Sequence, residues 1–336
     1  HFERDSRYQL KKAVRRCKEI GYQCKIGSKC EFYLFLQDDK GNPTLEVQDR
    51  AGYLDVAPLD RGENIRREIC LNLEQMGIKP ECSYHEHGPG QNEVDFRDNN
   101  ALGAADDLIS FKLAVRTIAK RHGLHATFMP KPKAGVDGSG MHINMSLDDQ
   151  DGNNIFGDPN DENGLSKEAY YFMGGIMKHI KGMTLINNPI INSYKRLVPG
   201  YNAPVNISWS RKNRTPLMRI TSSGAIGPRI VLRSPDGASN PYLVMAACLA
   251  CGLEGIKNKI EPPVSQDDIS QDEIAKLDFL PRTLMEAIRE FEKDTFLQNV
   301  LGKSVSELFI ARKSDEWSEF CQQVTAWEVE KYLNQI

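Results

Sequence analysis

The stretch that decides the fold runs from Tyr84 to Phe96 and reads YHEHGPGQNEVDF. Its Gly-Pro-Gly turn between two short polar runs is typical of a strand, a turn and a second strand, and not of a helix. Residues near the turn of an antiparallel pair can face the same side, so we expect Glu86 and Glu93 to present carboxylates to one pocket. Crowded carboxylates repel each other unless a cation lies between them, and Mg²⁺ or Mn²⁺ prefers such oxygen ligands. The alternative is that both are solvated charges on a surface hairpin.

The composition is that of an ordinary globular protein. The 336 residues are 40% hydrophobic and 26% charged, which is enough for one large domain or two small ones. A net charge of −3 argues against nucleic acid as the main partner, and no run approaches the ~18 apolar residues of a membrane span. The eight cysteines show no zinc or disulfide spacing. We therefore expect a soluble, cytoplasmic protein with reduced cysteines.

Periodicity around the hairpin predicts a mixture of strands and helices. Alternation in residues 24–37 predicts a strand with Lys29 and Glu31 on one face. Alternation in residues 137–147 predicts another, with His142, Asn144 and Ser146 on one face. Helical spacing marks residues 101–123 and 240–260, and amphipathic helices follow from residue 270, including 284–296 and 306–336. One domain over residues 1–336, with a helical part from about residue 262, is the simplest partition.

Arginines are concentrated in the second half of the chain. They are Arg211, Arg214, Arg219, Arg229 and Arg233. Such a group can be a solvated face, but beside an acidic metal site it is better suited to anchor a carboxylate or phosphate, whose oxygens match the guanidinium group. Residues 192–204 have no regular period and contain two prolines, as expected of a functional loop.

These motifs, in this order, resemble the catalytic domain of type I glutamine synthetases over almost the whole chain. The motifs are the strand with Glu31, the Glu86 and Glu93 hairpin, Gly138 to His142, the loop 192–204, Arg214, and Arg229 to Pro235. The resemblance implies an α+β fold in which helices back a curved antiparallel sheet, with active sites between the subunits of a ring-shaped homo-oligomer. It also implies two divalent ions and the ATP-dependent joining of glutamate and ammonia through γ-glutamyl phosphate.

The resemblance assigns roles position by position. Glu31, Glu86 and Glu93 match the ligands of the family's first metal site, and His142 matches the histidine of the second. Arg196 matches a glutamate-binding arginine. Further matches to phosphate, nucleotide or substrate contacts are Arg214, Arg219, Arg233, Gly138, Asn144 and Ser146.

The chain departs from the family pattern in the same pocket. Lys29 and Val231 replace two glutamates of the second metal site, and we expect the Lys29 ammonium to pair with Glu31 or a hairpin carboxylate in place of an ion. Asn202 replaces the glutamate that closes the site and takes the proton from ammonium, which an amide cannot do. Asp137 replaces an asparagine near the substrate, and Asn144 replaces a second histidine near the nucleotide.

These departures lead us to expect one Mg²⁺ or Mn²⁺ site, no assured use of ATP, and a ligase activity that is lost or redirected. The remaining pocket would then bind a small carboxylate or amino acid. The alternative is an active glutamine or γ-glutamyl-amine synthetase, since the missing carboxylate matters less if the amine arrives neutral. A guanidino phosphotransferase, which shares the sheet and the arginines, fits the motifs less well. The family's N-terminal β-grasp domain has no counterpart before His1, so we expect this chain to be a fragment.

Overall fold

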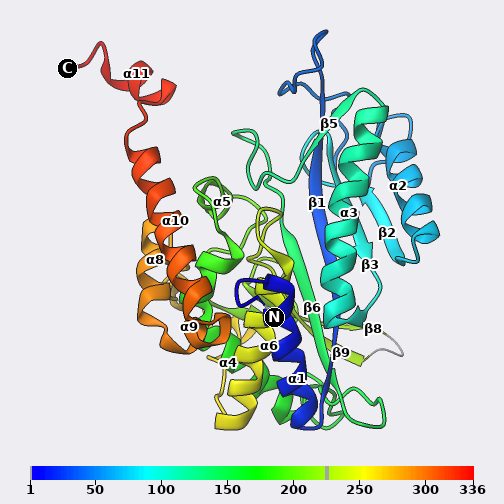
Figure 1. Ribbon diagram of the computed structural model, residues 1–336, viewed down its shortest axis with the longest axis vertical. Coiled ribbons are helices and arrows are strands. Elements are labelled where there is room, and N and C mark those ends of the chain that lie inside the picture. The colour runs from blue at the N-terminus through cyan, green and yellow to red at the C-terminus, as the bar shows by residue number, and fades with distance from the viewer. Residues whose placement is uncertain (1, 224–226) are drawn as a thin grey trace.

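The computed structural model describes residues 2–223 and 227–336, and these form an α+β fold as predicted (Figure 1). Within them, an open and mostly antiparallel sheet of nine strands has the order β2-β3-β1-β6-β9-β8-β7, with β4 and β5 also paired to β1. The strands are β1 (Gln23–Leu36), β2 (Pro80–His85), β3 (Gln91–Phe96), β4 (Asn99–Asn100), β5 (Leu124–Thr127), β6 (Met141–Asp148), β7 (Trp209–Ser210), β8 (Met218–Ser223) and β9 (Gly227–Leu232).

The register of the central strands brings distant parts of the sequence together. Antiparallel pairing of β1 with β3 places Glu31 opposite Glu93, and pairing of β1 with β6 places Lys29 opposite His142. Because side chains alternate along a strand, Lys29 and Glu31 share one face while Cys30 and Phe32 are fully buried in the core on the other. The polar face of the sheet therefore carries the candidate site.

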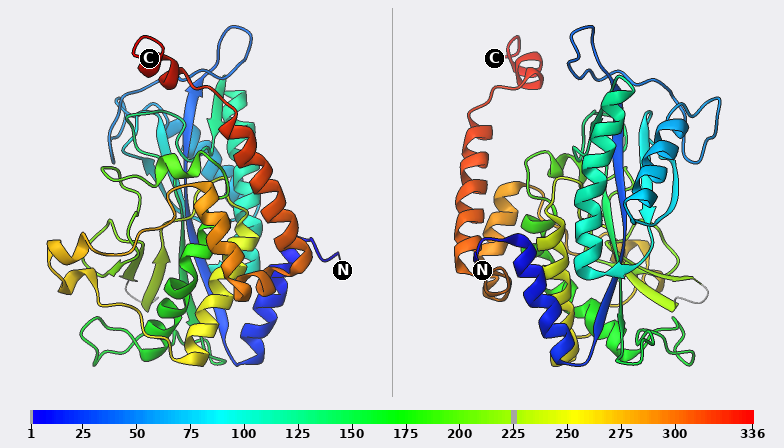
Figure 2. Two further views of the ribbon diagram at one scale, coloured as in Figure 1. Left: turned by 90° about the vertical axis from the view of Figure 1, so that its left-hand side faces the viewer. Right: turned by 45° about the vertical axis from the view of Figure 1, so that its right-hand side comes forward.

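Helices pack mainly on the other face of the sheet (Figure 2). They are α1 (Ser6–Glu19), α2 (Glu63–Gln75), α3 (Ala101–Arg121), α4 (Lys167–Asn187), α5 (Ser193–Arg196), α6 (Pro241–Asn258), α7 (Gln271–Ile274), α8 (Leu284–Lys293), α9 (Thr295–Leu301), α10 (Lys303–Cys321) and α11 (Ala326–Tyr332). Helices α4 and α6 approach through glycines: a Cβ on Gly175 would lie 2.1 Å from the carbonyl oxygen of Cys251, and one on Gly255 would lie 2.0 Å from that of Tyr171. Glycine at both positions is what lets these backbones touch.

The helices predicted over residues 284–296 and 306–336 are wrong as single elements. The second is divided into α10, which ends at Cys321, and α11, which begins at Ala326. The first is divided into α8 and α9 at Asp294, whose φ of −90° and ψ of 82° lie outside the helical region. The Asp294 side chain instead caps α9 by accepting a hydrogen bond from the Leu297 amide at 3.0 Å.

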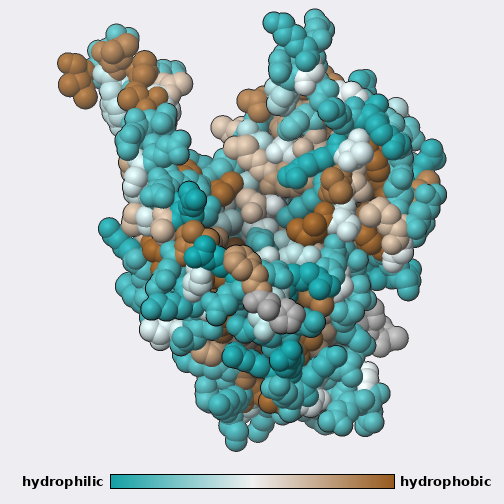
Figure 3. Space-filling view, viewed as in Figure 1, coloured by the Kyte–Doolittle hydropathy of each residue, from teal (hydrophilic) through white to brown (hydrophobic). Residues whose placement is uncertain are grey.

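The surface is mainly hydrophilic, with scattered apolar areas, one of which lies at the end of the chain (Figure 3). Helix α11 projects from the body and leaves Trp327, Leu333 and Ile336 exposed. Among the helices of the described residues, none is long and apolar enough to cross a membrane.

Candidate functional site

A cavity of about 150 Å³ opens on the polar face of the sheet and collects most of the predicted site residues. Those lining it are Glu31, Glu86, Glu93, Gly138, His142, Arg196, Asn202, Arg214, Arg219 and Arg233, together with Lys29 and Asp137. Two predicted contacts lie outside this lining. Ser146 lines a separate cavity with Arg229, and Asn144 is buried opposite Val231.

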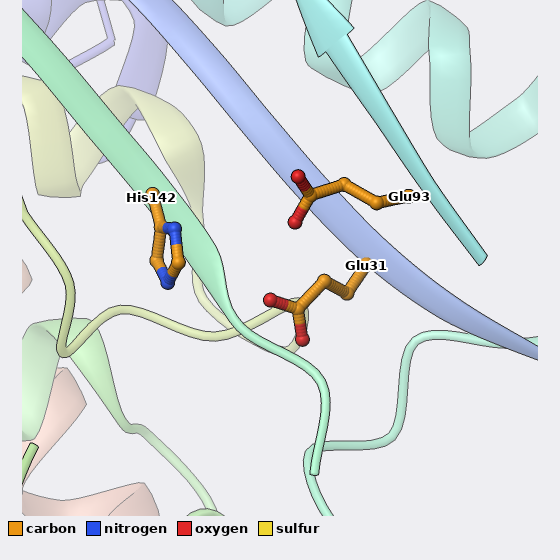
Figure 4. A group of neighbouring side chains, drawn as sticks. All are labelled: Glu31, Glu93 and His142. Carbon is orange, nitrogen blue, oxygen red and sulfur yellow. The ribbon is translucent and has the colours of Figure 1, made fainter. Parts of the chain in front are cut away.

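Three side chains converge at the floor of this cavity (Figure 4). Glu31 of β1, Glu93 of β3 and His142 of β6 each offer one ligand atom, and these atoms all lie within 4.8 Å of one another. Burial, followed by repulsion from Asp95 and Glu31, raises the pKa of Glu93 well above its usual value. The pKa of His142 is lowered by burial and by Arg233, so its imidazole is neutral and its ring nitrogen can act as a ligand. Glu86 shares the cavity but not this group, and burial and Glu31 raise its pKa to about 8.

Neutral donors hold the Glu31 carboxylate in place. Its Oε2 atom accepts hydrogen bonds from the Gly140 amide at 2.8 Å and from Gln91 Nε2 at 3.1 Å. A Cβ on Gly140 would lie 2.5 Å from the Nη2 atom of Arg196, so glycine is needed where β6 begins. The carboxylate is thus oriented without being neutralised.

Lys29 supplies the cation nearest to this acidic group. Its ammonium forms an ion pair with Asp95 and lies 3.5 Å from Glu93 Oε1, which is one of the hairpin carboxylates that we expected it to pair with. The Tyr84 hydroxyl donates a hydrogen bond to the same Glu93 oxygen. At the other predicted position of the second metal site, Val231 is buried and offers no ligand atom.

The residues present fit one divalent cation. Four carboxylates, those of Glu31, Glu86, Glu93 and Asp95, lie at this end of the cavity with the ammonium of Lys29, and burial and mutual repulsion raise the pKa of Glu86 and Glu93. The Oδ1 atom of Asp95 is buried and has no hydrogen-bond partner. Oxygen-rich donors with one imidazole suit Mg²⁺ or Mn²⁺. The resemblance divides Glu31, Glu93 and His142 between two ions, whereas their mutual proximity allows one ion to reach all three.

Four arginines face the acidic group across the cavity. Within residues 2–223 and 227–336, no carboxylate lies within 4.0 Å of the guanidinium groups of Arg196, Arg214, Arg219 or Arg233. Arg196 is held by the carbonyl oxygens of Ser234 at 2.8 Å and Arg233 at 3.0 Å. Burial, and then Arg196, lowers the pKa of Arg233 to about 10. Crowded cations without carboxylate partners are suited to hold an anion.

The other two arginines of the sequence cluster do not reach the cavity. Arg211 donates a hydrogen bond to the Glu162 carbonyl oxygen at 2.9 Å, and Arg229 forms an ion pair with Asp98 at 3.0 Å. The sequence could not separate these structural arginines from those in the cavity, because spacing along the chain does not show which side chains face the cavity.

A second group of possible metal ligands is already saturated by protein contacts. The ligand atoms of Asp49, Asp60 and His85 lie within 4.8 Å of one another, and all three residues are buried. However, Asp60 forms an ion pair with Arg66, and His85 bridges Asp49 at 3.1 Å and the Glu86 carbonyl oxygen at 2.7 Å. This group fixes the hairpin strand that carries Glu86.

Sequence reasoning assigned no role to several residues of the site, which are Tyr53, Tyr84, His87, Gln91 and Ala203 of the lining and Asp95 beside Lys29. Asp95 follows Glu93 by two positions in β3, so alternation along the strand could have placed it on the same face. Tyr84 is the cross-strand partner of Glu93 in the hairpin, and this register could have been counted back from the turn.

Comparison with known proteins agrees with the resemblance seen in the sequence. The family model for the glutamine synthetase catalytic domain matches residues 3–332. Glutamine synthetase from Clostridium saccharobutylicum is 49% identical over 99% of this chain and 76% of its own length, and that from Staphylococcus aureus is 47% identical with the same coverage. Among solved structures, GmaS in complex with ADP has a TM-score of 0.90 at 36% identity, covering 99% of this chain and 78% of its own, and GmaS without ligand has a TM-score of 0.88 at 36% identity, covering 99% and 77%.

Proposed function

The chain belongs to the glutamine synthetase family. We therefore propose that it is an ATP-dependent ligase that joins the carboxylate of an amino acid to an amine, and that glutamate is its main amino-acid substrate. The observation that carries this proposal is the convergence of Glu31, Glu93 and His142 opposite four arginines without carboxylate partners. Identity of 47–49% with curated glutamine synthetases supports a working ligase over the lost or redirected activity that the substitutions led us to expect.

We propose that the site works with one divalent ion, held by Glu31, Glu93 and His142 with Glu86 nearby. Such an ion neutralises charge on a transferred phosphoryl group. Lys29 lies where the resemblance implies a second ion. Its ammonium supplies one positive charge beside Glu93, and this charge, unlike a bound ion, cannot dissociate. The single charge of Lys29 keeps the other carboxylates of the floor from repelling an incoming anion.

The arginines have the complementary role of binding the substrates. Arg196 and Arg233 are rigid because backbone carbonyl oxygens and burial hold them, so they suit the fixed carboxylates of an amino acid. Arg214 and Arg219 lie together, and the Nε atom of Arg219 is buried without a partner, so these two suit the phosphates of a nucleotide. In-line transfer of a phosphoryl group depends mainly on such positioning and charge neutralisation.

A further part of the proposal concerns how the chain is organised into domains and subunits. We propose that the chain acts as one catalytic domain in a cytoplasmic homo-oligomer, supported by the family membership of residues 3–332. The choice of amine is set by the loop 192–204, since Asn202 and Ala203 of this loop line the cavity.

A second candidate is a binding protein of the same fold that holds an amino acid or nucleotide without turnover. The observation favouring it is the loss of ligand oxygen at Val231 together with the ion pair of Lys29, which leaves the floor with donors for one ion.

The test is release of ADP by the purified protein with ATP, Mn²⁺ and glutamate, measured with and without ammonium or hydroxylamine. We expect ADP release that requires both glutamate and a nucleophile, and its loss in Glu31→Gln, whose side chain keeps its size and its acceptor oxygen for the Gly140 amide. Binding of ATP and glutamate without any such release would support the second candidate and refute the ligase.

A further inference from the structure

We infer that Asp137 is the carboxylate that binds the cationic amine and accepts its proton, an inference that rests on the ligase function proposed above. Asn202, on the loop that closes the cavity, has no ionisable group for this task. Asp137 lines the same cavity and is in direct contact with Asn202.

In the part of the chain that the structure describes, the Asp137 carboxylate forms no ion pair. Its Oδ1 atom accepts hydrogen bonds from the amide nitrogen of Asn202 at 3.2 Å and from Asn202 Nδ2 at 3.3 Å. Within residues 2–223 and 227–336, no lysine, arginine or histidine nitrogen lies within 4.0 Å of this carboxylate, and its Oδ2 atom has no hydrogen-bond partner. A carboxylate that faces a cavity in this state attracts a small cation.

Burial lowers the pKa of Lys131 and the charge of Asp137 opposes this, but the ammonium makes its contacts elsewhere. Lys131 donates a hydrogen bond to the Val136 carbonyl oxygen, and its Nζ atom lies 3.3 Å from the ring centroid of Tyr201. The ammonium is thus satisfied by a carbonyl oxygen and an aromatic face, and it leaves the Asp137 carboxylate available.

The other carboxylates of the cavity are committed. Glu31 accepts two hydrogen bonds at one oxygen, and Glu93 receives the Tyr84 hydroxyl and lies beside Lys29. Both belong to the group of possible metal ligands, which needs its electron pairs for an ion. Glu86 also lies outside this group, but its carboxylate accepts a hydrogen bond from the His87 amide at 3.1 Å within the hairpin. Asp137 is the lining carboxylate that contacts the loop carrying Asn202.

The backbone at Asp137 is tied to the metal-binding floor. The Tyr33 hydroxyl donates to the Asp137 carbonyl oxygen at 2.6 Å, and Gln91 Nε2 donates to the Gly138 carbonyl oxygen at 3.1 Å while also reaching Glu31. On the opposite side, Arg233 Nη2 donates to the Asn202 carbonyl oxygen at 2.8 Å. The contact between residues 137 and 202 is therefore held at a fixed place between the floor and the arginines.

This contact contains one carboxylate and one amide. The family pattern described above also has one of each at these two positions, but with the two residues exchanged. The family pattern has an asparagine at position 137 and a glutamate at position 202, whereas this chain has Asp137 and Asn202. The negative charge has moved across the contact from the loop to the segment before β6. One substitution thus compensates for the other, and the cavity keeps a carboxylate at its mouth.

The proton and the bonds balance in the resulting step. An ammonium ion bound to Asp137 gives one proton to the carboxylate, and the nitrogen lone pair attacks the acyl carbon of the γ-glutamyl phosphate formed from glutamate and ATP. The carbon–nitrogen bond forms, the carbon–oxygen bond to phosphate breaks, and phosphate leaves with the electron pair. A second proton is lost from the nitrogen to solvent.

The experiment compares two nucleophiles in the wild type and in Asp137→Asn, which keeps the size and hydrogen bonding of the side chain. Ammonium is cationic at neutral pH and needs the carboxylate, whereas hydroxylamine is neutral and does not. We expect kcat/KM for ammonium to fall about 10²-fold in Asp137→Asn, and the loss with hydroxylamine to be at least about tenfold smaller. The exchange variant Asp137→Asn with Asn202→Asp is expected to regain ammonium-dependent turnover.

Equal losses with both nucleophiles, or an increase in KM for glutamate in place of ammonium, would overturn the inference. A binding measurement separates it from the ligase proposal: methylammonium chloride, compared with potassium chloride at equal ionic strength, is expected to raise the Tm of the wild type but not of Asp137→Asn. If the wild type shows no turnover yet binds methylammonium through Asp137, the ligase proposal fails and the cation site stands. If methylammonium stabilises both proteins equally, the inference is refuted whatever the turnover.

Discussion

The Nζ atom of Lys29 lies 3.5 Å from the Oε1 atom of Glu93, so an ammonium group occupies the edge of the acidic floor. The same ammonium pairs with Asp95, whose other carboxylate oxygen is buried without a partner. Lys29 is therefore a fixed cation beside the group of possible metal ligands, and we propose that it sets how many ions the protein needs.

Replacing Lys29 with methionine should make the protein depend on metal for its stability. Glu93 and Asp95 would lose their cation, and we expect the free energy of unfolding without metal to fall by about 1–3 kcal/mol, since removing one partner leaves buried charge uncompensated. Mn²⁺ should restore more stability to this variant than it adds to the wild type. The measurement is urea denaturation with and without Mn²⁺.

The matched control is Lys25→Met on the same strand, whose ammonium pairs with Asp148 away from the cavity. If Mn²⁺ stabilises the Lys25 and Lys29 variants equally, the ammonium of Lys29 has no part in the ion site.

Restoring ligand oxygens should create a second ion site. Lys29→Glu combined with Val231→Glu would place two carboxylates on β1 and β9, on either side of the strand that carries His142. We expect equilibrium dialysis to show two bound Mn²⁺ ions per chain in this double variant and one in the wild type. Val231→Glu alone should remain at one ion, because Lys29 still repels a second. A stoichiometry of one in the double variant would count against the assignment of these positions.

Gly138 should tolerate no side chain. A Cβ there would lie 2.4 Å from the Pro130 carbonyl oxygen and 2.9 Å from the Arg196 Cγ atom. Overpacking of this kind costs about 1–3 kcal/mol, so Gly138→Ala should lower both Tm and the affinity for glutamate by displacing Arg196. Gly157→Ala is the control, because its Cβ would make only an ordinary contact of 3.4 Å with Pro228. Thermal unfolding and glutamate KM of the two variants would be compared, and equal behaviour would contradict the packing argument.

The sequence predicted the strand residues of the site better than the loop residues around it. Alternation in β1 and β6 placed Lys29, Glu31 and His142 correctly on one face, because a period of two survives any error at the strand ends. Alternation could not show that Ser146, on the same face as His142, lines a different cavity, because that depends on which side chains surround each end of the strand. It also could not show that Asn202 contacts Asp137, because this pairing joins two loops 65 residues apart.

His179 should make stability depend on pH at some distance from the site. Its Nδ1 atom lies 2.6 Å from Asp294 and its Nε2 atom 2.5 Å from Glu254, so both ring nitrogens must carry protons. Burial lowers the pKa of His179, but the hydrogen bonds to Asp294 and Glu254 outweigh it and raise the pKa above the usual value. A raised pKa in the folded state stabilises the protein below the unfolded-state value of about 6.5, and this contribution is lost as the pH rises through the folded-state pKa.

The corresponding measurement is the free energy of unfolding of the wild type and of His179→Gln over a pH series from 6 upward. We expect the wild type to be more stable by about 1–3 kcal/mol at the acidic end, with the difference shrinking as the pH rises. The ion pair of Lys178 with Glu254 can form in both proteins. A difference that does not vary with pH would show that the ring stays neutral.

We propose that this chain is a ligase that works with one divalent ion beside Lys29. This is tested by turnover with ATP, glutamate and ammonium, measured against the number of Mn²⁺ ions bound per chain. We expect turnover to rise in proportion to the first ion and to be complete at one. Turnover that begins only with a second ion, or none at any occupancy, would contradict it.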